Sequence, residues 1–206
     1  LLLSVLIITS CDDEVLSEEE SEYWFLKSES LDDDDYLNKI KCYSKSLELD
    51  SSFRKAEILI SRGRAHQSLS HYDSSLADFN LALKIYANTS VNANDWADLY
   101  LDISNLKYEL GEYKSSIDFC NLALNFDDGF FTAEALNLRG LAQMMLKEDE
   151  KAISDFQESL SLFFDPIVMW NLAGAYGHIE LYELAISSLD KCLAALSEPD
   201  DSIFIY

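Results

Sequence analysis

The sequence has few residues that break helices and few basic residues. Its 206 residues include only 2 prolines and 6 glycines, and 15 Lys and Arg stand against 38 Asp and Glu. Nucleic-acid binding releases phosphate counterions and needs clustered Lys and Arg, so a formal net charge of −23 argues against nucleic acid as a partner. The same charge argues against electrostatic docking on an anionic lipid surface.

The remaining composition favours a folded, helical chain. Apolar residues make up 49% of the sequence, which is typical of a chain that folds rather than one that stays disordered. The shortage of Gly and Pro favours helices joined by short turns. About 195 residues follow Cys11, which is enough for one domain with a continuous core.

The first ten residues, LLLSVLIITS, contain no charge and lead directly into Cys11. A helix needs roughly 20 apolar residues to span a bilayer, so this run is too short, but it fits the apolar region of a signal peptide. With Ile8 at −3 and Ser10 at −1, the segment resembles the lipobox of bacterial lipoproteins. The resemblance implies that residues 1–11 are a signal peptide ending in a lipidated Cys11. Acyl chains would then anchor the protein in the bacterial cell envelope, with the outer membrane and its periplasmic or surface face as the expected site. The alternative is a buried N-terminal segment that happens to end in Cys.

Acidic residues dominate the next segment, since residues 12–35 hold twelve carboxylates against the single Lys27. Like charges repel, so we expect residues 12–22 to be an extended acidic tether. A calcium-binding EF-hand loop would need D-x-D-x-D-G and a closing Glu, and this pattern is absent. No metal site is expected here.

One pattern recurs along the chain: a polar turn, usually an aromatic residue, a small residue, Leu or Ile, and then an apolar pair. It occurs in HYDSSLADFNLALKI (71–85), EYKSSIDFCNLALNF (112–126), EDEKAISDFQESLSL (148–162) and LYELAISSLDKCLAA (181–195), with a fainter copy in DYLNKIKCYSKSLEL (35–49). A second helical stretch precedes each copy; SRGRAHQSL (61–69) and NLRGLAQMML (137–146) share Arg-Gly-x-Ala.

Two helices per repeat with a period near 34 residues is the pattern of tetratricopeptide repeats, and the chain is similar to this family over about residues 20–197. The resemblance implies an all-α fold, an α-solenoid of about five antiparallel helix pairs. The domain would cover 23–197, with repeats at about 20–53, 56–87, 97–128, 133–164 and 166–197. Residues 198–206 would start a capping helix or a truncated further repeat.

In this family a small residue on the first helix of each repeat lets the second helix pack closely. Repeats 2 to 5 have Gly63, Ser104, Gly140 and Ala173 in that position, whereas repeat 1 has Lys27.

No group of residues has the spacing of an active site or a metal site. We interpret Cys42, Cys120 and Cys192 as small buried residues, because they lie in non-adjacent repeats and cannot reach one another. The three histidines, His66, His71 and His178, form no i, i+4 pair, and no G-x-S-x-G or phosphate-binding loop is present. We therefore predict no enzymatic activity and no cofactor.

The first helices of tetratricopeptide repeats line a concave groove that binds protein or peptide ligands. Carried over position by position, the resemblance assigns this groove Trp24, Leu31, Ile60, Arg64, Gln67, Leu101, Asn105, Tyr108, Asn137, Leu141, Met144, Trp170, Gly174 and His178. The lining is mostly apolar and aromatic, which predicts a surface for a partner protein; the alternative is that these aromatic residues pack between repeats. Asn105 matches one position of the carboxylate-clamp subclass, but the lysines of that clamp are missing, so that subclass is not expected.

Together these features predict a non-enzymatic, membrane-anchored interaction scaffold. Two alternatives stay open. One is an assembly factor for envelope or outer-membrane proteins. The other is a glycan-handling accessory lipoprotein, in which Trp24 and Trp170 would stack on sugar rings.

Overall fold

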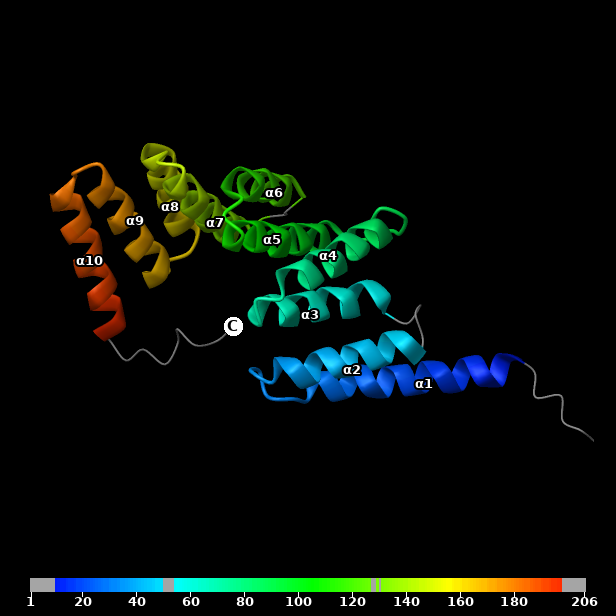
Figure 1. The fold of residues 1–206 in the computed structure, drawn as a ribbon. Coiled ribbons are helices and arrows are strands. Elements are labelled where there is room, and N and C mark those ends of the chain that lie inside the picture. Colours follow the sequence, from blue (N-terminus) through cyan, green and yellow to red (C-terminus); the bar gives the residue numbers. More distant parts are fainter. Residues whose placement is uncertain (1–9, 50–53, 127–128, 130, 198–206) are drawn as a thin grey trace, which may run out of the picture. The chain divides into compact units, whose positions relative to one another are not determined.

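The computed structural model describes residues 10–49, 54–126, 129 and 131–197, and in these residues it contains α-helices and no strand (Figure 1). The helices are α1 (Ser10–Glu29), α2 (Tyr36–Leu49), α3 (Lys55–Ser68), α4 (Tyr72–Tyr86), α5 (Ala93–Glu109), α6 (Tyr113–Phe126), α7 (Thr132–Met145), α8 (Asp149–Leu162), α9 (Pro166–His178) and α10 (Tyr182–Ser197). The predicted all-α fold of antiparallel helix pairs is confirmed.

The chain divides into two compact units, residues 1–90 and 91–206. The first unit contains the hairpins α1–α2 and α3–α4. The second contains α5–α6, α7–α8 and α9–α10, and within it each hairpin packs on the next through α6 against α7 and α8 against α9. For brevity, α1, α3, α5, α7 and α9 are called the A helices, and their partners the B helices.

Four of the five hairpin turns share one backbone design. Two residues before the B helix, the chain adopts the left-handed conformation, with φ between 58° and 75°, at Ser70, Gly111, Lys147 and Glu180. The next residue donates a backbone hydrogen bond to a carbonyl five positions back, as His71 does to His66 and Glu148 to Gln143, each at 2.9 Å. This six-to-one bond is the Schellman closure of a helix C-terminus, and it ends the A helix in the same way in these four hairpins.

The small residue of each A helix lies where the B helix approaches most closely. A Cβ added at Gly63 would lie 2.6 Å from Phe79 Cε1, and one added at Gly140 would lie 2.6 Å from Phe156 Cε1. Ser104 Oγ lies 3.0 Å from Cys120 Sγ. Small size on the A helix is thus matched to the bulk of the facing side chain.

In repeat 1 the small position belongs to Ser28, and the prediction that Lys27 occupies it is wrong. Ser28 is fully buried and Lys27 is exposed. The hydrogen bonds fix the register: Ser46 Oγ donates to Ser21 O (2.8 Å), as Ser159 Oγ donates to Ala133 O (2.7 Å). Seven residues after Ser21 comes Ser28, just as Gly140 follows Ala133.

A longer turn is the physical reason for this shift. Six residues, 30–35, join α1 to α2, whereas three join α3 to α4 and α7 to α8. Helix α1 ends one residue after Ser28, while α3 continues for five residues after Gly63. In repeat 1 the longer turn takes the place of the last turn of the A helix. The small residue is therefore one position closer to α2 than in the other repeats, and counting back from α2 by the usual spacing gives Lys27 in place of Ser28.

The acidic segment also differs from its prediction. Helix α1 begins at Ser10 and includes residues 12–22, so the extended conformation predicted for the tether is wrong. Cys11 falls in the first turn of this helix. Residues 1–9, which contain most of the predicted signal peptide, and the predicted capping segment 198–206 lie outside the described residues.

Two arginines connect three helices each. Arg139 of α7 forms a two-pronged ion pair with Asp155 of α8, at 2.7 and 2.8 Å, and its third nitrogen donates to Asn121 of α6 at 2.7 Å. Arg62 makes the same set of bonds, to Asp78 of α4 and Ser44 of α2. The hydrogen bond to Asp155 is the main reason that the pKa of Arg139 is raised. The Arg of the Arg-Gly-x-Ala pattern therefore joins its own hairpin to the preceding one.

Candidate functional site

The residues predicted to line a groove differ in burial. Ile60 and Leu101 are buried. Leu101 belongs to a core cluster with Cys120 of α6 and Ala135 of α7, so it packs between repeats. Trp170 occupies the matching position of α9, three residues before the small residue, yet it is 63% exposed. Its exposure has a simple cause: within the described residues, no hairpin follows α9–α10.

Several other predicted positions pack against neighbouring side chains. Tyr108 meets the ring of Tyr113 edge-on with 5.5 Å between centroids. Leu141 and Met144 are partly buried against the core of α8 to α10. His178 is half exposed, and its Nδ1 lies 2.8 Å from Asp149 Oδ1.

Arg64, Asn105 and Gly174 are exposed on the A helices, while Gln67 is partly buried.

The register shift also moves the predicted repeat 1 residues off the groove positions. Trp24 is half-buried beneath Lys27, whose Nζ lies 4.5 Å from its ring centroid. Leu31 is half-buried in the turn after α1. The position equivalent to Leu101 is Phe25, which is buried with Tyr43 and Ile58.

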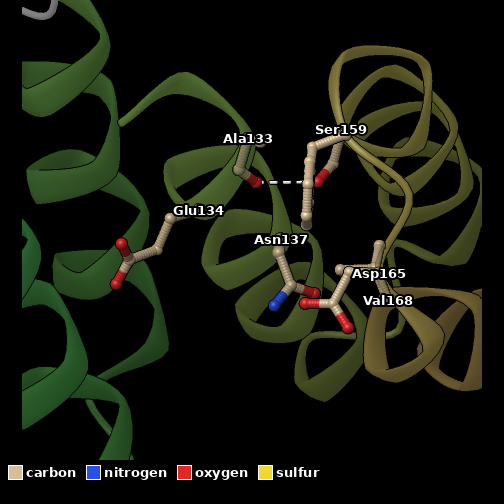
Figure 2. A pocket seen from close by; sticks show the side chains of 7 residues that line it. Ala133, Glu134, Asn137, Ser159, Asp165 and Val168 are labelled. Carbon is tan, nitrogen blue, oxygen red and sulfur yellow. Dashed lines mark hydrogen bonds between the residues drawn. The ribbon is translucent and has the colours of Figure 1, made fainter. Parts of the chain in front are cut away.

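The second unit contains a cavity of about 530 Å³ at one end of α7, α8 and α9 (Figure 2). Residues from the first turns of α7, the end of α8 and the start of α9 line it, and they are Ala133, Glu134, Asn137, Ser159, Phe163, Asp165 and Val168. Only Asn137 among them was predicted as a groove residue. Figure 2 shows the side chains of Asn137 and Asp165 pointing toward each other from facing segments.

The polar groups of the cavity are held in place by hydrogen bonds. Asp165 caps α9, because its Oδ1 accepts from Ile167 N at 2.7 Å, and Pro166 follows at the first helical position, where no N–H is needed. Asn137 Oδ1 accepts from Asn171 Nδ2 at 3.1 Å. These bonds connect α7 to α9 and orient an amide and a carboxylate at the cavity.

Exposed apolar side chains lie in the connection between α8 and α9 and on α9 itself. Phe163, which is 60% exposed, lines the cavity directly, and Ile167 (68%) and Trp170 lie one turn apart on the helix that Asp165 begins. The sequence interpretation missed Phe163, Asp165 and Ile167. The run LFFDPIVMW, with an Asp-Pro helix start inside an apolar stretch, was the available signal.

The titratable side chains of the described residues do not gather into a metal centre. Those residues contain no group of three His, Cys, Asp or Glu side chains able to hold a metal ion. The rings of His66 and His71 lie 5.7 Å apart, and burial lowers the pKa of His66. Burial raises the pKa of Cys120 to about 11, which keeps this thiol protonated and unreactive. Among the described helices, none is both long enough and apolar enough to span a bilayer.

Comparisons with known proteins identify the fold. The chain matches no protein-family model and no curated protein sequence. It is similar to solved structures of MamA from Desulfovibrio magneticus RS-1, with 16% identity, a TM-score of 0.71 and coverage of 92% of this chain and 98% of that one. It is also similar to YrrB, described as a TPR protein with an unusual peptide-binding site (19% identity, TM-score 0.63, 94% of each chain). A third similar structure is that of pilF from Pseudomonas aeruginosa (16% identity, TM-score 0.65, 92% of this chain and 79% of that one). The chain has the tetratricopeptide-repeat fold. At these identities the likeness shows the fold alone.

Proposed function

We propose that this chain is a non-enzymatic scaffold that binds a partner protein or peptide in the second unit, at the exposed side chains of Phe163, Ile167 and Trp170 and at the cavity that Phe163 lines. The observation that supports this most directly is the exposure of Phe163, Ile167 and Trp170, the first of which lines a cavity together with Asn137 and Asp165. Large apolar groups gathered next to a few oriented polar groups are typical of interaction sites. The likeness to YrrB, whose structure is described as having a peptide-binding site, agrees with this proposal.

Trp170 is the expected anchor of this interface. A tryptophan buries a large area on binding, and truncation of such an anchor commonly costs about 2 kcal/mol or more of binding free energy. Because Trp170 is exposed, its removal should leave the fold intact. Loss of binding would then report on the interface and not on unfolding.

A peptide-display selection against the full chain tests the proposal. We expect enriched peptides to bind Trp170→Ala at least tenfold more weakly, with binding measured by fluorescence anisotropy. Tyr182→Ala is the matched control, since Tyr182 is an equally exposed aromatic residue (61%) at the start of α10. Failure to enrich any peptide, or equal effects of the two substitutions, would contradict the proposal.

Anchoring to a membrane is a separate proposal that rests on the segment LLLSVLIITSC. We infer that Cys11 is acylated and holds the scaffold in the bacterial cell envelope, because two or more acyl chains give stable attachment. The more specific role of an envelope assembly factor requires in addition that the bound partner is an envelope protein. Intact mass of membrane-extracted protein tests the anchor: a lipidated chain beginning at Cys11 supports it, and an unmodified chain that retains residues 1–10 contradicts it.

Glycan binding is the second candidate function, since the exposed indole of Trp170 also suits stacking on a sugar ring. Saccharide titration followed by tryptophan fluorescence distinguishes the two. Saturable quenching that is lost in Trp170→Phe but kept in Trp96→Phe would favour the glycan.

A further inference from the structure

We infer that copies of this chain associate head to tail, with α1 of one copy packing on α10 of another. The two helices carry the two halves of a contact that the fold already makes three times, where α3 packs on α2, α7 on α6 and α9 on α8. In each case an A helix covers the B helix of the preceding hairpin. Within the described residues, no A helix follows α10 and no B helix precedes α1.

Helix α10 has the apolar pair with which the other B helices contact the next A helix. The pair is an Ile six residues before the small residue late in the B helix and a Leu one residue after it. Where an A helix covers the B helix, the pair is partly buried, as Ile40 and Leu47 in α2, Ile117 and Leu124 in α6, and Ile153 and Leu160 in α8. Counted in the same way from Cys192, the pair of α10 is Ile186 and Leu193, which are 59% and 62% exposed. Helix α10 thus presents an uncovered surface of the kind that elsewhere holds an A helix.

A polar residue between the two apolar ones completes this face. Two residues before the late small residue, α6 has Asn121 and α2 has Ser44. Each accepts a hydrogen bond from the arginine of the A helix that covers it, at 2.7 and 3.0 Å. The same position of α10 is Asp190, an exposed carboxylate. A basic group placed like those arginines would therefore meet a full negative charge, which makes a stronger bond than an amide or a hydroxyl does.

Helix α1 has a basic residue at the position of those arginines. Each arginine comes directly before the small residue of its A helix, as Lys27 does before Ser28. On α2, Cys42 replaces the aspartate with which each arginine pairs, four residues before the late small residue Ser46. Its own hairpin thus offers Lys27 no carboxylate at that position, and the exposed ammonium group can pair with one from outside.

Aromatic rings surround Lys27 on the same side of α1. Its Nζ lies 4.5 Å from the ring centroid of Trp24 and 5.8 Å from that of Tyr23. The position of Trp24 is four residues before the small residue, and in the A helices that cover a B helix it holds the buried residues Leu59, Leu136 and Met169. Trp24 is only half-buried, and Tyr23 is 59% exposed. Both rings would lose contact with water if α1 covered a B helix, and this burial favours association.

A second copy suits these faces because one contact would satisfy both of them. The rings of α1 would pack on the apolar pair of α10, and Lys27 would pair with Asp190. Symmetric contacts are disfavoured, since two α10 faces would bring two carboxylates together and two α1 faces would bring two ammonium groups together. Because the contact is heterologous, a dimer keeps one free face of each kind and can bind further copies.

Sedimentation velocity of the full chain at increasing concentration tests the inference. We expect the weight-average mass to rise above the 23.4 kDa of the monomer, because association follows mass action. Lys27→Glu or Asp190→Lys places like charges across the contact and should weaken association at least about tenfold. The two substitutions combined in one chain restore opposite charges and should recover it. Lys114→Glu and Glu158→Lys make the same charge changes at exposed positions of α6 and α8 and should have no effect.

A mixing experiment tests whether the contact is head to tail. Lys27→Glu blocks the α1 face, and Ile186→Ser with Leu193→Ser removes the apolar pair of α10. Each variant alone should be monomeric, whereas their mixture should form a 1:1 dimer and nothing larger, because one intact face of each kind remains. Circular dichroism checks that these exposed substitutions leave the helices intact.

Self-association of either variant alone would indicate a symmetric contact and would overturn the inference. So would a wild-type chain that stays monomeric, a mixture that forms no dimer, or association that survives all of these substitutions. A chain that associates only after residues 198–206 are removed would show that this segment covers α10 in the full chain, and the inference would again be wrong.

Discussion

Replacing Gly140 with alanine tests whether close packing in the A–B hairpins requires glycine. The new Cβ would lie 2.6, 2.9 and 3.0 Å from three ring carbons of Phe156, which is itself fully buried against α9. Three short contacts to one enclosed ring place the steric cost near the upper end of the range for overpacking, about 3 kcal/mol. Alanine gains about 1 kcal/mol of helix propensity over glycine. The expected net loss in the free energy of unfolding is about 2 kcal/mol, or about 6 °C in Tm.

Gly174→Ala is the control for this prediction. It lies in the middle of α9, where an added Cβ meets only Met144 Cε at 3.6 Å, an ordinary contact. It should therefore stabilise the chain by about 1 kcal/mol. Urea unfolding followed by circular dichroism measures both variants, and Gly140→Ala should be partly rescued by Phe156→Leu, as expected for two residues in contact. If Gly140→Ala were as stable as Gly174→Ala, the assignment of Gly140 as a required close approach would be wrong.

Three further predictions concern buried polar groups. Arg139→Gln should cost about 2 kcal/mol of stability in urea unfolding, because it leaves the buried carboxylate of Asp155 without its ion pair, and Arg139→Met with Asp155→Leu should recover most of that loss. Burial lowers the pKa of His66 from 6.5, so His66 binds a proton more readily in the unfolded chain than in the folded one. The free energy of unfolding should therefore keep the full contribution of His66 above pH 6.5 and lose it as the pH falls below 6.5. His66→Phe should weaken this pH dependence. Cys120 should resist iodoacetamide at pH 8 until urea is added, because burial raises its pKa to about 11, and peptide mapping by mass spectrometry checks this. Rapid labelling of the native protein would contradict the last prediction.

The fold was predictable because its determinants are local and repeated. The small residues Gly63 and Gly140, with the bulky Phe79 and Phe156 sixteen positions later, specify a close A–B contact wherever the connecting turn has its usual length. Repeat 1 shows the limit of this reasoning. The turn at 30–35 is longer than the other hairpin turns, and α1 ends sooner after its small residue than α3 does. The helix loses one residue more than the turn gains, and the sequence pattern around Lys27 contains no sign of this difference.

The acidic segment illustrates a second limit. Repulsion among the carboxylates of residues 12–22 predicts an extended chain, but the structure has a helix that continues into the buried face of Ser21, Phe25 and Ser28. Packing of that face against α2 stabilises the whole helix, because adding residues to an existing helix costs much less than starting one. A charge pattern read alone does not include this contribution from distant contacts.

The candidate site was only partly predictable, because it depends on where the repeats differ. A repeat pattern treats Leu101 and Trp170 as equivalent, yet one is buried by α7 and the other is exposed on α9. The difference arises from the neighbouring hairpin and not from the residue's own position. Likewise, Phe163 and Asp165 lie in the connection between hairpins, where the repeat pattern sets no requirement. A binding site on an array of similar repeats must be built from such unshared residues, since the shared ones are already used to hold the hairpins together. This is why Asn137 was the one cavity residue that the repeat pattern identified.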